Sequence, residues 1–409
     1  METKQASKQA DMKKRILYFM PDNPAVGKAG NLTRSAKILD YLQERFSNLA
    51  VIEFLSVSDW GDWDEEGISA FNKRYPSITL TLINRKISKK KPIKRALFYK
   101  IRNLIPNIIR GVSVDITNPY FRNKVKKHLN KQHYDTAIMS YSSWGSLAFL
   151  FDIRPYLIID THDFLTAQSN NRKKIIGKLF QSEINILRRF DEIWTLSVEE
   201  KYIYEQFTSS KVVHHPITYD PKPLNKDTRH LYDIIYVASK NPHNIASIKW
   251  FIEKVSPLLK NYKIHIIGRI CSEIDDNHTH IVKHGMVENI DEFYEHARIA
   301  ICPMLSGTGV KIKVVEALAN NLPIVTNSRG VDGLMNKTGN GCLVAEDANE
   351  FASHIIRLME DDLFYHTIRS QAAQYFQNCH ASSKEDQLFT SIFERMNTGS
   401  TDTEQLNKA

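Results

Sequence analysis

Short apolar runs alternate with longer amphipathic stretches along most of this chain. Runs such as ILYFM at residues 16–20 and DIIYVA at 233–238 have the length and the content of buried strands. Between the runs, apolar residues recur every three or four positions, as they do on one face of a helix. Strands that alternate with helices are typical of βαβ units, so the pattern predicts an α/β fold with parallel sheets.

The pattern runs through the chain twice, and a polar segment divides the two series. Strands are expected first at 16–20, 50–56, 78–83, 136–140, 156–160, 192–196 and 211–214, and then at 233–238, 263–268, 281–284, 299–303 and 323–326. Helices are expected between most of them, for example at 31–46 with Asn31 as the N-cap, at 244–260 and at 310–320. The segment PITYDPKPLNKDTRH between the two series contains three prolines, which is typical of an interdomain linker.

This organisation predicts two doubly wound Rossmann-type domains that face a central cleft. The predicted parts are a disordered N-terminus at 1–12, a first domain at 13–215, the linker at 216–230, a second domain at 231–364, helices at 365–396 that pack back on the first domain, and a polar tail at 397–409. Open α/β sheets bind ligands beyond the carboxyl ends of their strands, near the point where the strand order switches. We therefore expect the chemistry on loops that directly follow strands in both domains.

The composition is that of a globular protein, since 42% of the 409 residues are hydrophobic and 25% are charged. Its four cysteines, Cys271, Cys302, Cys342 and Cys379, are far apart in sequence, which fits a reducing compartment better than a disulfide framework or a zinc site. No apolar run reaches the roughly 18 residues of a membrane span, and the polar start does not resemble a signal peptide. These features predict a cytoplasmic protein.

The net charge of +9 is concentrated in one part of the chain. Residues 85–110 hold ten basic residues and no acid, interleaved with apolar residues at roughly helical spacing from Pro92 onward. A helix with one cationic and one apolar face is typical of contact with anionic lipid, at the inner face of the cell membrane in this case. A solvated helix face is the alternative. Nucleic acid is disfavoured, because no nucleic-acid-binding motif accompanies the charge.

The most informative segment is SGTGVKIKVVEALANNLPIVTNSRGVDGL at 306–334, directly after a predicted strand. Gly307 and Gly309 allow a tight turn and close approach of a ligand to the backbone. A helix that begins near Val310 adds free N–H groups, and Lys311 and Lys313 add positive charge. The combination predicts an anion site suited to a diphosphate.

Glu316 lies about two turns into the same helix, among apolar neighbours. A carboxylate in this position can accept hydrogen bonds from both hydroxyls of a ribose, and a partly buried structural acid is the plainer interpretation. The following SRGVDG supplies a second loop of small residues, which we expect near the same cleft.

The ordered string at 306–334 resembles the donor-binding segment of family 4 glycosyltransferases, which have the GT-B fold. The variant that it resembles reads G-x-G-V-K-x-K-x-x-E-A followed by P-V-V-T-x-x-x-G-x-x-G. The resemblance covers residues 13–365, strongly in the second half and weakly before Asp160. It implies a retaining, metal-independent hexosyl- or deoxyhexosyltransferase that uses a nucleoside-diphosphate sugar as substrate and needs no cofactor.

The resemblance also implies roles for individual residues of the second half. Glu316 matches the second acid of the family's E-x7-E motif, which holds the ribose, whereas Thr308 stands where the first acid would be. The sequence departs here from the family pattern, so the donor sugar cannot be inferred from it. The expected donor-binding residues are Gly30, Ser239, Lys240, Gly285, Met286, Gly307, Thr308, Gly309, Val310, Lys311, Lys313 and Glu316.

Three of these residue groups match the family more loosely. Ser239 and Lys240 follow the first strand of the second domain, where the family often has a basic residue on the diphosphate. Gly285 and Met286 lie in the stretch whose backbone holds the nucleobase. Gly30, in the loop GKAG at 27–30, resembles a glycine loop that offers backbone amides to the reacting centre.

His162 and Asp163, in LIIDTHDF, are the candidate catalytic residues on the acceptor side. They follow a predicted strand, and in the family this position contacts the reacting sugar and the acceptor. We assign His162 a binding and orienting role, with a structural hydrogen bond as the alternative, and Asp163 the role of an acceptor-side base. The D-x-D string at Asp62 and Asp64 is interpreted as surface, because no apolar strand precedes it, and no metal site is predicted.

These features together predict a glycosyltransferase that transfers a sugar to a glycan, lipid-linked in this interpretation, in bacterial surface polysaccharide assembly. Two alternatives stay open: a sugar-nucleotide epimerase on the same fold, and a catalytically silent binding subunit. The second is open because Thr308 replaces the first acid of the family's motif.

Overall fold

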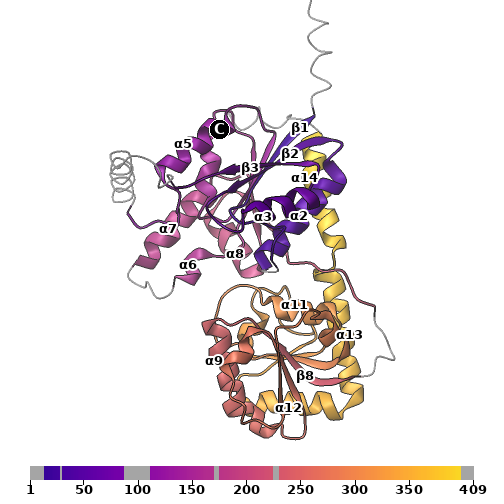
Figure 1. Ribbon diagram of the computed structural model, residues 1–409. Coiled ribbons are helices and arrows are strands. Elements are labelled where there is room, and N and C mark those ends of the chain that lie inside the picture. Colours follow the sequence, from indigo (N-terminus) through magenta and orange to yellow (C-terminus); the bar gives the residue numbers. More distant parts are fainter. Residues whose placement is uncertain (1–12, 28–29, 87–110, 170–174, 224–229, 398–409) are drawn as a thin grey trace, which may run out of the picture. The chain divides into compact units, whose positions relative to one another are not determined.

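The computed structural model describes residues 13–27, 30–86, 111–169, 175–223 and 230–397, although not the side chains from 391 onward. It divides into two compact units (Figure 1), the first being Met1–Thr195 with Lys201–Val213 and the second Leu196–Glu200 with His214–Ala409. The predicted ends at 1–12 and 398–409 lie outside the described residues, as do residues 87–110 of the basic stretch predicted at 85–110.

The first unit is built on a seven-stranded sheet with the order β3-β2-β1-β4-β5-β6-β7. Its strands are β1 Lys14–Phe19, β2 Ala50–Val57, β3 Ile78–Ile83, β4 Thr136–Ser140, β5 Tyr156–Asp160, β6 Glu192–Thr195 and β7 Lys211–His214. The ladders from β3 to β6 are parallel. The helices are α2 Gly30–Phe46, α3 Glu65–Arg74, α5 Pro119–Leu129, η1 Gly145–Leu150, α6 Leu165–Gln168, α7 Ile176–Leu187 and α8 Val198–Phe207.

The second unit is built on a six-stranded parallel sheet with the order β10-β9-β8-β11-β12-β13. Its strands are β8 Tyr232–Val237, β9 Ile264–Ile267, β10 Ile281–Gly285, β11 Ala297–Cys302, β12 Ile324–Thr326 and β13 Cys342–Val344. The helices are α9 Pro242–Trp250, η3 Phe251–Val255, η4 Ser256–Leu258, η5 Arg269–Glu273, α10 Asp291–His296, α11 Ile312–Ala319, η6 Ser328–Val331, α12 Ala348–Glu360, α13 Asp362–Cys379 and α14 Ser383–Asn397.

The α/β class and the two Rossmann-type sheets are thus confirmed. The strand order switches between β1 and β4 in the first unit and between β8 and β11 in the second. Loops that leave the carboxyl ends of these strands are the places where such sheets bind ligands. In both units the central strands are buried, since Ile16 to Phe19 and Ile234 to Tyr236 have no exposed surface.

Several predicted helices differ in detail from the structure. α2 begins at Gly30, so Asn31 lies inside its first turn and is not the N-cap. The helix predicted at 244–260 is divided into α9, the π-turn η3 and the 3-10 turn η4, where Pro257 removes a backbone donor. The helix predicted from 365 onward consists of α13 and α14, with a break at residues 380–382.

α13 belongs to the core of the second unit, where Ala372, Tyr375 and Phe376 are buried beside residues of α11. Packing of 365–396 on the first domain stays a prediction for the residues beyond α13. The predicted linker is also fastened to the second unit, since Tyr219 pairs with Ala381 in an isolated bridge. In the described part of the chain, every helix is too short or too polar to span a bilayer.

Candidate active site

The loop between β11 and α11 is shaped by two glycines. Gly307 and Gly309 have φ angles of 102° and 72°, which residues other than glycine rarely adopt. α11 begins at Ile312, two residues later than predicted, and Lys311 is its N-cap. Thr308 is exposed at the tip of this loop.

Lys311 fastens the glycine loop from inside. Its side chain is buried, and its Nζ donates to the carbonyl oxygens of Thr308, at 3.3 Å, and of Gly309, at 2.7 Å. Burial lowers the pKa of the Lys311 ammonium. The predicted contact of this lysine with a diphosphate stays a prediction, and in the structure its ammonium stabilises the loop that would hold one.

Lys313 lies two residues further along the chain, in the first turn of α11, and is also largely withdrawn from water. Its Nζ donates to Asn244 Oδ1 at 2.7 Å and lies 4.9 Å from the centre of the Tyr236 ring. Burial lowers the pKa of this ammonium as well. Within the described residues, neither Lys311 nor Lys313 forms an ion pair. Two desolvated cations with no carboxylate in contact favour binding of an anion, because an anion would supply a direct countercharge.

The loop after β8 is joined to the glycine loop across the switch point. Asn244 Nδ2 donates to the Ser239 carbonyl at 2.8 Å, and the same side chain accepts from Lys313. His243 Nδ1 lies 2.8 Å from Ser306 Oγ. Lys240 instead pairs with Glu273, so its predicted contact with a diphosphate would require that ion pair to open.

Glu316 is held by two tyrosines. Tyr294 donates to Oε2 at 3.1 Å and Tyr219 donates to Oε1 at 3.4 Å. Burial raises the pKa of this carboxyl group. Each oxygen of Glu316 thus already accepts one hydrogen bond and keeps a further lone pair, which leaves its predicted contact with a ribose chemically feasible.

The expected nucleobase stretch lies at the end of β10. Gly285 has a φ of 66° and its carbonyl accepts from Gly268 N at 2.6 Å, so it is held beside the loop after β9. Met286 is 68% exposed. His284 turns into an aromatic cluster, where its ring lies 5.3 Å from that of His265 and 4.7 Å from that of Phe293.

The second loop of small residues does lie beside the first. A Cβ placed on Gly333 would be 2.4 Å from Cγ2 of Val310. Gly333 is therefore packed directly against the glycine loop, as the sequence predicted.

In the first unit, a buried ion pair joins α2 to β5. Arg34 Nε and Nη2 donate to the two oxygens of Asp160 at 2.7 and 2.9 Å. Both side chains are almost fully buried. This bidentate pair fixes the end of β5, from which the loop with His162 and Asp163 begins.

His162 has a backbone and a protonation state that are unusual for histidine. Its φ is 57°, and its ring stacks on that of Tyr141 with centroids 4.3 Å apart. Nε2 lies 3.3 Å from an Asp160 oxygen, yet neither ring nitrogen makes a hydrogen bond within the described residues. Burial lowers the pKa of His162 to about 4, so the ring is neutral at pH 7. Strained residues that the surrounding structure holds in place are common at functional sites.

Asp163 and Gly30 lie near this histidine in the first unit. Asp163 is half-buried, and its charge is one of the influences that raise the pKa of Tyr141. Gly30 begins α2, and the side chain of the next residue, Asn31, lies near the phenol of Tyr141. His162, Asp163 and the start of α2 are therefore grouped around Tyr141.

Glu183 of α7 is a positioning residue that sequence reasoning missed. It is fully buried and accepts hydrogen bonds from Ser142 Oγ, Leu165 N, and both N and Oγ1 of Thr166. These contacts fasten the loop after His162 to α7 and to the loop after β4. An acid inside the apolar stretch LFQSEINIL was the available signal.

The D-x-D string is part of a helix start. Asp64 Oδ1 accepts from Gly67 N at 2.8 Å as the N-cap of α3, and Asp62 and Asp64 are exposed, as predicted. Trp63 between them is buried, which the sequence did not predict. No group of three or more metal-ligating side chains lies together in the described residues.

Residues 232–361, which contain the glycine loop and Glu316, match the model of the family "Glycosyl transferases group 1". The second unit is a group 1 glycosyltransferase domain. A 44.6 kDa protein in the cps region of Klebsiella pneumoniae is 28% identical over 197 residues, which are 44% of this chain and 49% of that protein. The match thus spans about half the length of that relative.

Solved glycosyltransferases share the fold of the whole chain. Sucrose-phosphate synthase from Thermosynechococcus elongatus has a TM-score of 0.64 at 13% identity, with 95% of this chain and 100% of that one covered. Anabaena HepE, solved with UDP-glucose, has a TM-score of 0.60 at 13% identity over 93% and 99% of the two chains. A variant of S. aureus TarM, solved with Fondaparinux, alpha-GlcNAc-glycerol and UDP, has a TM-score of 0.62 at 12% identity over 93% and 99%. The chain therefore has the GT-B fold.

Proposed function

We propose that this group 1 glycosyltransferase moves a hexosyl or deoxyhexosyl group from a nucleoside-diphosphate sugar to a glycan acceptor with retention of configuration. The acceptor in this proposal is lipid-linked, and the pathway is the assembly of a bacterial surface polysaccharide. The protein needs no metal ion or cofactor and works at the inner face of the cell membrane.

The observation that carries the donor side is the pair Lys311 and Lys313. Both ammonium groups are desolvated, and neither forms an ion pair within the described residues, although the charges of Asp332 and Glu316 act on them from further away. They lie where a glycine loop meets the N-terminus of α11, at the switch point of the sheet. A diphosphate carries the negative charge that this arrangement lacks. The two ammonium groups and the helix N-terminus would neutralise the leaving diphosphate in place of a metal ion.

Several relatives support this choice of donor and pathway. HepE and TarM were solved with UDP or UDP-glucose, and the Klebsiella relative is encoded in a cps region. We extend the class of donor from HepE and TarM, and the polysaccharide pathway from the Klebsiella relative.

The proposed reaction needs little proton chemistry from the protein. The bond between the sugar C1 and the β-phosphate oxygen breaks, and the acceptor oxygen bonds to C1. The acceptor proton passes to the departing phosphate oxygen, so no strong base is needed. The neutral ring of His162 orients the reacting hydroxyl by hydrogen bonding, and Asp163 is the alternative proton acceptor.

An apolar groove beside this loop supports a lipid-linked acceptor. It has a volume of about 640 Å³ and is lined by Phe164, Thr166, Ala167, Ile176, Gly177, Phe180, Ile203 and Phe207. Phe164 directly follows Asp163, so the groove opens at the candidate catalytic loop. An acyl or prenyl chain is the ligand that such an apolar lining favours. The basic residues at 85–110 add the charge that anionic lipid attracts.

The test is a panel of nucleotide sugars in a thermal-shift assay, followed by turnover with and without membrane extract of the source cells. A bound donor at 100 times its Kd should stabilise the protein by about 2.7 kcal/mol. Sugar transferred to an extractable lipid would support the proposal. An isomerised free donor would identify an epimerase, and binding without turnover would identify a silent subunit. Unchanged turnover in Glu316→Ala would overturn the donor-site assignment.

A further inference from the structure

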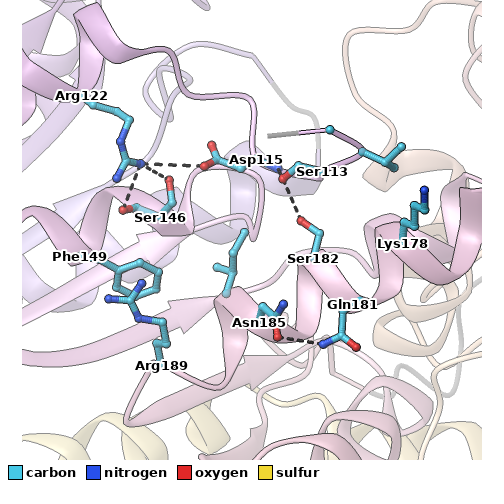
Figure 2. Close-up of a pocket in the computed structure, with 13 residues that line it drawn as sticks. Ser113, Asp115, Arg122, Ser146, Phe149, Lys178, Gln181, Ser182, Asn185 and Arg189 are labelled. Atoms are coloured by element: carbon cyan, nitrogen blue, oxygen red, sulfur yellow. Dashed lines mark hydrogen bonds and ion pairs between the residues drawn. The ribbon is translucent and has the colours of Figure 1, made fainter. Parts of the chain in front are cut away.

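A second cavity in the first unit has a polar lining and a volume of about 750 Å³. It lies between α7, the loop that begins at Gly111, the start of α5 and η1 (Figure 2). Its lining residues are Gly111, Val112, Ser113, Asp115, Arg122, Ser146, Phe149, Lys178, Gln181, Ser182, Asn185, Ile186 and Arg189. The proposed reaction uses none of these residues.

One face of α7 supplies a continuous polar stripe to this cavity. Lys178, Gln181, Ser182 and Asn185 recur at helical spacing along α7, and Arg189 follows two residues beyond the end of the helix (Figure 2). The stripe contains amides and a hydroxyl between two cations and has no acid. At about 1.5 Å per residue, α7 rises about 10 Å from Lys178 to Asn185, and Arg189 extends the stripe beyond the end of the helix, so the stripe is long enough for two or more sugar rings.

Both cations of the stripe are available to a ligand. Within the described residues, neither Lys178 nor Arg189 forms an ion pair. The guanidinium of Arg189 lies 3.5 Å from the centre of the Phe149 ring, which fixes its plane and leaves its edge to bind a carboxylate with two hydrogen bonds. Figure 2 shows this stack at one end of the stripe, with Lys178 near the other.

The acid in the lining does not repel an anion. Asp115 accepts from both N and Oγ1 of Thr117 at 2.8 and 2.7 Å and lies 3.9 Å from Arg122. Its charge is therefore compensated inside the wall. Ser113 and Ser182 share a hydrogen bond of 2.8 Å across the cavity, so the wall and the helix are joined there.

The stripe leads away from the candidate catalytic loop. Because α7 connects β5 to the parallel strand β6, it runs antiparallel to them. Lys178 is thus near the edge of the sheet where His162 lies, and Arg189 is near the opposite edge. This direction fits a chain that extends outward from the reacting end better than a single sugar.

We propose that this cavity binds an anionic glycan, in which sugar hydroxyls contact the amides of α7 and carboxylates contact Lys178 and Arg189. The inference rests on the proposed function, because the ligand would be the growing acceptor glycan. Two cations, one at each end of the stripe, are too few for a nucleic-acid backbone, which carries a charge at every nucleotide. The intervening amides favour hydroxyl groups.

The test measures binding of tetragalacturonic acid, with maltotetraose as the uncharged probe, to the full chain. We expect the native protein to bind the uronate in preference. Arg189→Gln and Lys178→Met should each weaken this binding at least tenfold, while Arg188→Gln, an exposed control with the same charge change, should not. Melting temperatures would show that each variant folds.

Other outcomes would overturn the proposal. These are equal binding of the two probes, equal loss in Arg188→Gln, no binding of either probe, or loss of binding to phosphatidylglycerol vesicles in Arg189→Gln with uronate binding unchanged. Failure of the proposed function can be distinguished from failure of this inference. If the proposed function is wrong, no donor is turned over, whereas uronate binding can still be measured.

Discussion

The imidazole of His162 stacks on the phenol of Tyr141 with ring centroids 4.3 Å apart and planes 21° from parallel. Both residues have left-handed backbones, with φ angles of 57° and 66°, and both follow the carboxyl end of a strand. Neither backbone is favoured for a residue with a side chain. The stack therefore holds two adjacent strained loops together at the ligand-binding edge of the first sheet.

The buried state of His162 predicts acid sensitivity. Its pKa is about 4 in the folded protein against an ordinary 6.5, so the unfolded chain binds the proton first. The stability due to this group is present above pH 6.5 and is lost as the pH falls toward 4. We expect a loss of about 2–3 kcal/mol between pH 7 and pH 4.5 from this residue.

Urea unfolding of the native protein and of His162→Asn at the two pH values checks this prediction. Asparagine tolerates the left-handed backbone, so the variant should fold and should lose less stability on acidification. His133→Asn, which removes an exposed histidine of the same unit, is the control and should retain the native pH dependence. Equal pH dependence in all three proteins would contradict the assignment.

Removal of the Lys313 charge should weaken donor binding without weakening the fold. Its ammonium is desolvated and contacts Asn244 rather than an acid, so Lys313→Met removes a buried charge at the cost of one hydrogen bond. We expect an apo melting temperature within a few degrees of the native value. The donor KM should rise about 10- to 100-fold, as for loss of a charge-assisted hydrogen bond of 1.5–3 kcal/mol. Lys249→Met, on the exposed surface of α9, is the matched control. A large drop in melting temperature with an unchanged KM would mean that Lys313 is structural.

Glu316 should discriminate ribose from deoxyribose. If its carboxylate accepts from the ribose hydroxyls, the native protein should bind the nucleoside diphosphate more tightly than its 2′-deoxy form, and Glu316→Gln should reduce this difference. Tyr294→Phe should act differently, because it removes one donor to a buried carboxylate and should cost about 1–3 kcal/mol of stability. Calorimetric titration of the ribo- and deoxyribonucleotides measures the first effect and chemical unfolding the second. An undiminished preference for ribose in Glu316→Gln would exclude the predicted contact.

Much of the fold and of the donor loop follows from local sequence signals. The strands were predictable because each is a short apolar run with polar or turn-forming residues on both sides. For example, β8 (YDIIYV) begins and ends one residue before the expected bounds. The glycine loop was predictable because Gly307 and Gly309 stand directly between a strand and a helix. Such features depend on neighbours in sequence.

The contacts that hold the sites depend on residues far apart in sequence, and these were not predictable. Arg34 and Asp160 are 126 positions apart, and Tyr219 and Glu316 are 97 apart. Nothing in the local pattern distinguishes Arg34 from a surface arginine, because its burial results from the packing of α2 on β5. Lys240 illustrates the opposite case, since its position suggested a free cation and the fold pairs it with Glu273.

The packing of Gly333 against Val310 gives a stability prediction with an internal control. A Cβ at Gly333 would lie 2.4 Å from Val310 Cγ2, whereas a Cβ at Gly339 would meet nothing within 4 Å. Both glycines have positive φ, at 85° and 62°, so alanine at either position costs about 1–2 kcal/mol of backbone strain. Gly333→Ala should cost a further 1–3 kcal/mol or so from overpacking.

The two variants should also differ in donor binding. Val310 belongs to the glycine loop, so Gly333→Ala should displace that loop and raise the donor KM, while Gly339→Ala should leave it unchanged. Urea unfolding and donor titration of both variants test this together. If Gly333→Ala destabilised the protein no more than Gly339→Ala, the loops around Val310 would have to be less tightly packed than the structure describes. If it destabilised the protein without changing donor binding, the packing would be correct but the loop would not contact the donor.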